Sequence, residues 1–247
     1  MLELLAVAAA GVAAGASNSI AGGGSLITFP TMVALGVPPL SANVTNTIGV
    51  IPGAVGGGLG YTDLLREQRQ RFLRFLMPMM LGSVAGTVAL LLTSNAAFEA
   101  IVPLLVAGSC LLLLLQPRLM HLSHAGNEGS PFLTAGIAFC GAYGAYFGSA
   151  VSILLLALLA LFVLDTIQHL NAIKILLVGF SNLLAGVVYA FLAPVEWRFV
   201  VVLWVFSLIG GRLGAQLARR VPSDTLRVAI AVLGLGVAVV LGVRAIE

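Results

Sequence analysis

Lys174 is the only lysine in the chain, and it lies several residues inside an apolar segment. A charged side chain in the middle of a membrane costs about 2.5 kcal/mol or more unless it is paired. If Lys174 faced a cavity, its ammonium group would attract a small anion. Two alternatives stay open: the side chain could extend to the nearer membrane interface, or Asp165, nine residues earlier, could neutralise it. We favour the anion-binding interpretation.

A run of small residues, Asn18 to Ser25, interrupts the first hydrophobic stretch. It contains three consecutive glycines, and irregular backbone inside a membrane is tolerated only where protein buries it or where it lines a cavity. Ser25 could cap the helix that follows, so that N–H groups and the positive end of the helix dipole would attract an anion. Close helix packing on the glycines is the alternative. A second break near Gly148 favours a binding site.

Asparagines stand at matching places in both halves of the chain. Asn43, Asn46 and Thr47 of the first half correspond to the segment with Asn171 and Lys174 in the second. Amide side chains inside a membrane need hydrogen-bond partners, from neighbouring helices or from a substrate. Their concentration at equivalent places favours a shared polar cavity. The predicted substrate-binding residues are Asn18, Ser19, Gly22, Gly23, Gly24, Ser25, Asn43, Asn46, Thr47, Ser149, Ser152, Asn171, Lys174 and Asn182.

Other reactive residues lack the partners that chemistry requires. Cys110 and Cys140 lie in apolar runs, as small buried hydrophobic residues do. His121 and His124 have no further metal ligands nearby in the sequence. The sequence contains no nucleophile–base arrangement, phosphate-binding loop or metal-ligand quartet. We therefore expect no enzymatic activity, no cofactor and no metal site.

The composition requires a membrane. Of 247 residues, 60% are hydrophobic and only 9% are charged, and the mean hydropathy is +1.11. A soluble domain carries about 25% charged residues. The sequence therefore predicts an all-α polytopic membrane protein with the lipid bilayer as a partner. The net charge of +3 does not indicate nucleic-acid binding, because the arginines gather at the ends of hydrophobic segments. A homo-oligomer is compatible with the sequence.

The two halves of the chain resemble each other. Gly82 and Gly86 recur as Gly210 and Gly214, 128 positions later, and other matches follow at offsets of 126 to 128. We expect a first repeat, a linker and a second repeat, each repeat having five hydrophobic elements of which the first two are short or broken. The boundaries are 1–116, 117–131 and 132–247. The expected segments are 4–37, 42–61, 72–92 and 97–116, then 132–164, 169–192, 198–218 and 226–244.

Charge predicts opposite orientations for the two repeats. The loop 62–74 is rich in arginine and its counterpart 194–198 is not, whereas the loop 219–227 is basic and its counterpart 94–99 is not. Because basic loops remain on the cytoplasmic side, equivalent loops should face opposite sides of the membrane. This pattern predicts two inverted repeats, an architecture of transporters. We expect a cytoplasmic linker, both termini outside, and insertion in the inner (cytoplasmic) membrane.

At these residues the chain resembles the TauE/SafE family of sulfite and organosulfonate exporters. The resemblance covers Gly15 to Pro30, Ala42 to Thr47, Asn171 to Lys174 and the closing Gly210 to Gly214. It implies transport of small sulfur-containing anions, such as sulfite, sulfoacetate or thiosulfate, driven by protons or by the membrane potential. The family often has a lysine where this chain has Thr47, so cationic recognition would rest on Lys174 alone.

These observations together predict a secondary transporter that works by alternating access, with the anion bound near the middle of the membrane. A passive anion channel is the alternative, because the same helix ends could line a pore. A structural or assembly subunit is the third hypothesis, and it predicts no binding of sulfur anions. For the coupling proton, Asp165 is the best candidate in the sequence.

Overall fold

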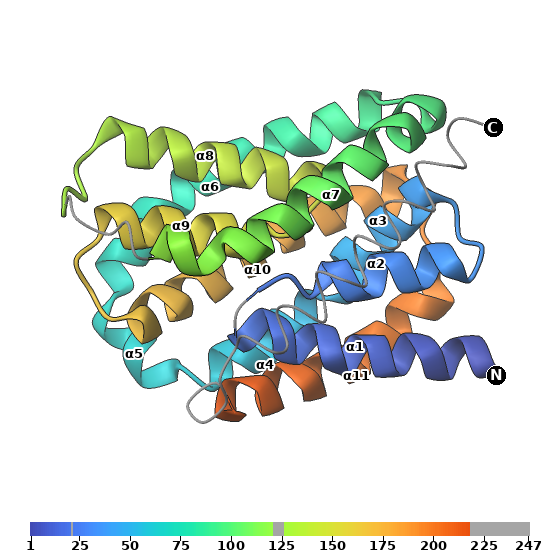
Figure 1. Cartoon of the computed structure of the whole chain (residues 1–247), viewed down its shortest axis with the longest axis horizontal. Helices are drawn as coiled ribbons and strands as arrows, with labels where there is room; N and C mark the ends of the chain where they lie inside the picture. Colours follow the sequence, from blue (N-terminus) through green and yellow to red (C-terminus); the bar gives the residue numbers. More distant parts are fainter. Residues whose placement is uncertain (21, 121–125, 218–247) are drawn as a thin grey trace.

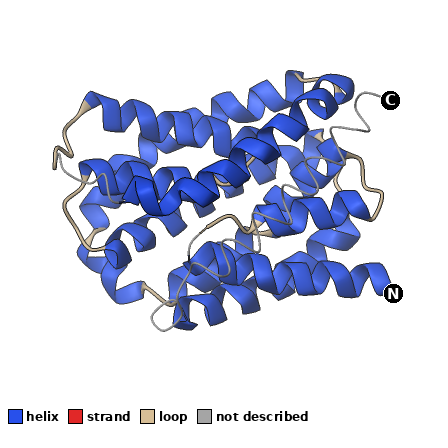
Figure 2. Cartoon of the chain, viewed as in Figure 1, coloured by secondary structure: helices blue, strands red, loops and turns tan. Residues whose placement is uncertain are grey.

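The computed structural model describes residues 1–20, 22–120 and 126–217, and within these ranges all regular structure is helical (Figures 1 and 2). Five helices, α1, α6, α7, α10 and α11, are long and apolar enough to cross a membrane, which confirms the predicted class. The last expected segment, 226–244, and the histidines of the linker lie outside the described residues. The helices are α1 (Leu2–Ile20), α2 (Ser25–Ala34), α3 (Pro39–Gly49), α4 (Ile51–Leu59), α5 (Thr62–Glu67), α6 (Arg69–Leu92), α7 (Asn95–Met120), α8 (Pro131–Tyr146), α9 (Val151–Phe162), α10 (Ile167–Leu192) and α11 (Trp197–Leu217).

Both predicted breaks are present. The first, after α1, has positive φ angles at Gly22 (97°) and Gly23 (81°), and the second, after α8, has them at Gly148 (74°) and Ala150 (63°). Backbone in this region cannot continue a right-handed helix and favours glycine. At 1.5 Å per residue, α2 and α9 are only about 15 and 18 Å long. Each is too short to span the bilayer, and each turns back alongside the helix before it (Figure 1).

The third hydrophobic element of the first half differs from the expectation of one segment, 42–61. It is divided at Val50 into α3 and α4. The cause is Pro52, which has no N–H to donate to the carbonyl of Ile48, four residues earlier. The indole Nε1 of Trp204 donates to that carbonyl instead, at 2.9 Å. The equivalent segment of the second half contains no proline and forms the single helix α10.

The two predicted repeats are interlocked. The two most extensive helix–helix interfaces are α1 with α11 and α6 with α8. By the sequence offset, α1 corresponds to α8, and α6 corresponds to α11. The first helix of each repeat therefore packs on the fourth element of the other repeat. Corresponding helices also run in opposite directions along the bundle, α1 against α8 and α6 against α11 (Figure 1).

Glycines at both interfaces let the backbones touch. A Cβ on Gly82 would collide with the carbonyl of Ala138, and a Cβ on Gly210 would collide with the carbonyl of Val12. Val12 and Ala138 are themselves 126 positions apart. Gly86 and Gly214 show the same relation to Ala142 and Ala16, at the next turns of the same helices. The glycines that revealed the repeat are therefore the contact points between its two copies.

Gly82→Ala is expected to lower the free energy of unfolding by about 1–3 kcal/mol, because the new methyl group must force two backbones apart. Gly108→Ala is the matched control: Gly108 is also helical, but nothing lies within 4 Å of the position of its Cβ. There the substitution should be neutral or stabilise by up to about 1 kcal/mol, through helix propensity. Thermal unfolding of both variants in detergent measures the difference. Equal melting temperatures would contradict the backbone contact.

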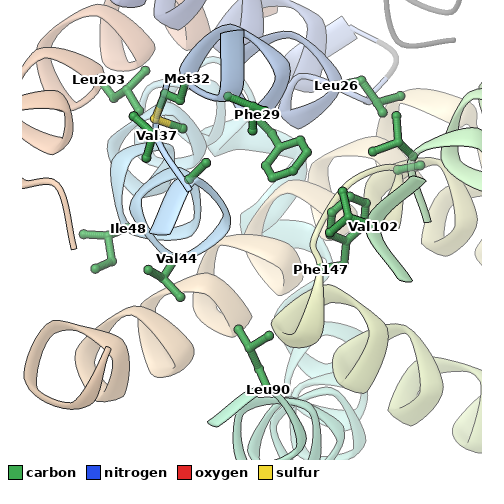
Figure 3. Close-up of a cluster of buried hydrophobic side chains, with 14 of the residues drawn as sticks. Leu26, Phe29, Met32, Val37, Val44, Ile48, Leu90, Val102, Phe147 and Leu203 are labelled. Atoms are coloured by element: carbon green, nitrogen blue, oxygen red, sulfur yellow. The ribbon is translucent and has the colours of Figure 1, made fainter. Parts of the chain in front are cut away.

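Helix contacts divide the described chain into two groups. The first group consists of α1, α2, α3, α4 and α11, and the second consists of α6, α8, α9 and α10; α7 contacts helices of both groups, and α5 packs on α10. Contacts between the groups are smaller, and α10 against α3 and α4 makes most of them. A large apolar cluster also bridges the groups: Figure 3 shows Phe29 of α2 near Phe147 of the second break. The rings of Phe29 and Phe147 meet edge to face, with centroids 5.4 Å apart.

Candidate functional site

The two helix breaks meet at the boundary between the groups. A Cβ placed on Gly22 of the first break would lie only 2.8 Å from the Cβ of Ser152, which follows the second break. Beside this contact is a cavity of about 20 Å³, room for about one water molecule. Four predicted site residues from three helices line it together with apolar side chains. The lining residues are Asn18, Ser19, Val50, Gly53, Ala54, Ser152, Ile175, Val178 and Asn182.

Lys174 does not line this cavity but contacts Asn18 of its lining, and it is completely buried, with 0% of its surface exposed. Its Nζ donates to the carbonyl oxygen of Asn18 at 3.1 Å. That carbonyl belongs to the last turn of α1, the negative end of the helix dipole, where carbonyl groups lack partners within the helix. The side chain therefore does not extend to a membrane interface. No carboxylate of the described residues forms an ion pair with it.

Asn43 and Asn171 make equivalent contacts across the repeats. The Nδ2 of Asn171 donates to the carbonyl of Ser19 near the end of α1, and the Nδ2 of Asn43 donates to the carbonyl of Tyr146 at the end of α8, both at 2.9 Å. The Oδ1 atoms of both side chains are buried without a hydrogen-bond partner. Each asparagine thus ties the end of one repeat's first helix to the other repeat, and keeps one acceptor unused.

The first break is held together by its own side chains. The Oδ1 of Asn18 accepts from the amide of Gly24 at 2.8 Å, and the Oγ of Ser17 donates to the carbonyl of Gly22 at 2.8 Å. The expectation that Ser25 caps α2 is wrong: Gly24 is the N-cap residue, and Ser25 is the first residue of the helix. Asn18 could reach the Gly24 amide because the positive φ angles of Gly22 and Gly23 fold the chain back on α1.

Several predicted site residues lie away from the cavity. Thr47 donates to the carbonyl of Asn43 within α3 at 3.0 Å, and Asn46 accepts a hydrogen bond from Thr28 of α2. Gly23 faces Leu113 of α7, and the Oγ of Ser149 is buried without a partner. Their role in substrate binding stays a prediction. The structure thus gathers Asn18, Ser19, Gly22, Ser152, Asn171, Lys174 and Asn182 around one place, and Asn43, Asn46, Thr47 and Ser149 elsewhere.

The sequence analysis did not predict Tyr61 as a residue of this site. Its hydroxyl lies 3.2 Å from the Nδ2 of Asn171, the same group that holds the end of α1. Its repeat counterpart Tyr189 donates to the carbonyl of Ala145 in the last turn of α8, at 2.7 Å. The signal was available, because the two tyrosines match at an offset of 128. The apolar lining from α4 and α10 carried no such signal.

A second polar site lies at the end of the bundle near α5. Arg71 binds Asp165 at 2.5 Å and Glu128 at 2.6 Å, and Asp165 also contacts His169 at 2.5 Å. Burial acts to raise the pKa of Asp165, but hydrogen bonds from His169, Arg71 and the amide of Thr166 outweigh it, so the pKa lies below its ordinary value. Asp165 therefore neither neutralises Lys174 nor lines the cavity between the groups.

Long apolar helices, breaks that meet inside the bundle and a buried lysine close to a small cavity are together typical of a polytopic membrane transporter. The family model "Sulfite exporter TauE/SafE" matches residues 7–241, nearly the whole chain. The chain belongs to this family. It is 28% identical over 225 residues to a "Probable membrane transporter protein" of Haemophilus influenzae, covering 87% of this chain and 86% of the relative.

Two further relatives carry similar names. The chain is 30% identical over 228 residues to the "Probable membrane transporter protein ORF9" of a Sinorhizobium species, covering 88% of this chain and 83% of the relative. It is 28% identical over 210 residues to the "Probable membrane transporter protein YfcA" of Escherichia coli K12, covering 83% and 76%. The family and these names agree on a multi-pass membrane transporter.

Proposed function

We propose that this protein is a secondary transporter of small sulfur-containing anions, such as sulfite, thiosulfate or an organosulfonate, across the inner membrane. The observation that carries the proposal is the buried side chain of Lys174, whose Nζ has a neutral carbonyl as its partner close to a small cavity that polar residues line in part. A buried cation without a counter-charge is costly, and an anion removes that cost. The family description supports the class of substrate.

Binding would exchange one partner of Lys174 for another. The Asn18 carbonyl offers a partial negative charge, and an oxoanion offers a full one, so the anion would displace the carbonyl from Nζ. The amides of Asn18 and Asn182 and the hydroxyl of Ser152 would donate to the remaining oxygens. A cavity of about 20 Å³ holds one water but no sulfonate. The helix groups must therefore separate locally before the anion enters.

The moving units would be the two helix groups, and not the two repeats. The first helix of each repeat packs on the other repeat through backbone contacts at glycines, and these close contacts resist sliding. The smaller boundary between the groups contains the cavity and the Lys174–Asn18 contact. Rocking of one group on the other would expose this boundary to each side in turn, driven by a proton gradient or by the membrane potential.

The antiparallel course of corresponding helices supports two repeats inverted in the membrane. The N-terminus and the arginine-rich segment around α5 lie at opposite ends of the bundle (Figure 1). By the positive-inside rule, the α5 end would face the cytoplasm and the N-terminus would lie outside. The basic loop after α11, which entered the same argument, lies outside the described residues.

Counterflow in proteoliposomes tests the proposal. Liposomes containing the purified protein and a high internal concentration of unlabelled thiosulfate, sulfite or taurine are diluted into trace ³⁵S-labelled compound. A transporter is expected to give transient, saturable accumulation of at least one of them. Ohmic, non-saturating current carried by the same anions would replace the transporter with a channel. A chain that neither moves nor binds any of them would contradict both and favour the structural subunit.

A further inference from the structure

A large hollow lies at the end of the bundle near α5, and it shares no lining residue with the cavity between the groups. Its volume is about 780 Å³, and it is open to the surface. The start of α6, the end of α5, the loop before α8 and the start of α10 supply its walls. The lining residues are Arg66, Glu67, Gln68, Arg69, Gln70, Arg71, Arg74, Glu128, Asp165 and His169.

Several residues of the lining are joined by ion pairs and hydrogen bonds. Arg71 holds Glu128 and Asp165 and also donates to the side chain of Gln68 at 3.0 Å. Gln68 is buried, and its Nε2 donates to the carbonyl of His169 at 3.2 Å. The third carboxylate of the lining, Glu67, is largely exposed and lies 3.6 Å from the Nε2 of His169. These contacts fix four separate segments against one another.

Three arginines of the lining take no part in this network. Arg66, Arg69 and Arg74 form no ion pair with another described residue. Arg69 is the first residue of α6, a helix of 24 residues, and the side chain of its N-cap residue Gln68 does not cap it. The first-turn amides of α6 and the positive end of its dipole therefore add to the guanidinium groups.

We propose that this hollow is a second anion site, built to hold a tetrahedral oxoanion group through Arg66, Arg69, Arg74 and the first turn of α6. Guanidinium groups and helix N-termini both match the oxygens of sulfonate, sulfate and phosphate. The group could belong to a dissolved anion or to the headgroup of an anionic lipid. For a dissolved sulfur anion, the site would collect substrate at the mouth of the pathway, a role that rests on the proposed function.

Equilibrium binding of inorganic sulfate tests the site. The full chain is placed in nanodiscs of phosphatidylcholine, and ³⁵S-labelled sulfate binding is measured at 150 mM NaCl. The variant Arg66→Gln/Arg69→Gln/Arg74→Gln is expected to lower the affinity about tenfold or more, since each charge-assisted hydrogen bond contributes well above a neutral one. The control Arg118→Gln/Arg198→Gln also removes exposed arginines and should bind as wild type.

A second arm identifies the source of the anion. Adding phosphatidylglycerol to the nanodiscs should suppress sulfate binding if a lipid headgroup takes the site, and native mass spectrometry should then show phosphatidylglycerol retained by wild type and lost by the triple variant. Binding of neither sulfate nor lipid, or an equal loss in the control, would overturn the proposal. The same measurements on Lys174→Met protein separate the two sites, because sulfate binding that remains there and is lost with the three arginine substitutions belongs to this hollow even if the proposed function fails.

Discussion

A disulfide between residues 54 and 179 is expected to abolish transport completely and reversibly. Ala54 lies on α4 of the first helix group, and Gly179 lies on α10 of the second. A Cβ on Gly179 would lie 2.9 Å from the Cβ of Ala54. The two Cβ atoms of a disulfide lie about 3.8 Å apart, so the helices need to move by only about 1 Å for the bond to form. The cross-link would pin the boundary that must open around the cavity.

The measurement compares oxidised and reduced protein. Ala54→Cys/Gly179→Cys is made in a background with Cys110→Ala and Cys140→Ala, reconstituted, and assayed for counterflow before and after dithiothreitol. The matched control is Gly60→Cys/Ala215→Cys, which joins the C-cap residue of α4 to α11 within the first group across a similar Cβ–Cβ distance, 2.5 Å. Oxidation should leave the control active. Full activity of the oxidised 54–179 protein, or equal inhibition of both, would contradict movement between these groups.

Lys174→Met is expected to lower the transport rate at least about thirtyfold while leaving the protein folded. Losing a charge-assisted contact to an anion in a dry site costs about 2 kcal/mol or more, which corresponds to this factor. Methionine has a similar length and avoids the cost of burying an ammonium group with only a carbonyl partner, so stability should hold or rise. Loss of transport with unchanged or raised stability would show that Lys174 binds the substrate and is not needed for the fold.

Counterflow and thermal unfolding are measured on the same preparations. Arg198→Met is the control, because it also removes a cation but at an exposed position near the N-terminus, where Arg198 pairs with Glu3 and Glu196. Its transport should match wild type. A folded Lys174→Met protein with wild-type flux and wild-type substrate affinity would remove Lys174 from the site and with it the observation on which the proposed function rests.

The sequence by itself determined the membrane class and the helix breaks, and it predicts the internal repeat. Each of these is a local property: a bilayer needs uninterrupted apolar runs, and glycines at membrane depth interrupt a helix wherever the chain later packs. It also found Lys174, because a charge in an apolar segment stands out at the level of one residue. The division of the third element at Pro52 was equally local, and a proline rule applied there would have found it.

The partners of these residues were decided only by the tertiary structure. Nothing in the sequence shows that Lys174 meets the carbonyl of Asn18, 156 residues earlier, or that Asp165 turns away to Arg71. Likewise the repeated glycines indicated a duplication, but not that the first helix of each predicted repeat packs on the other one. The physical reason is that burial and hydrogen bonding depend on which faces meet, and that depends on the whole set of helix contacts.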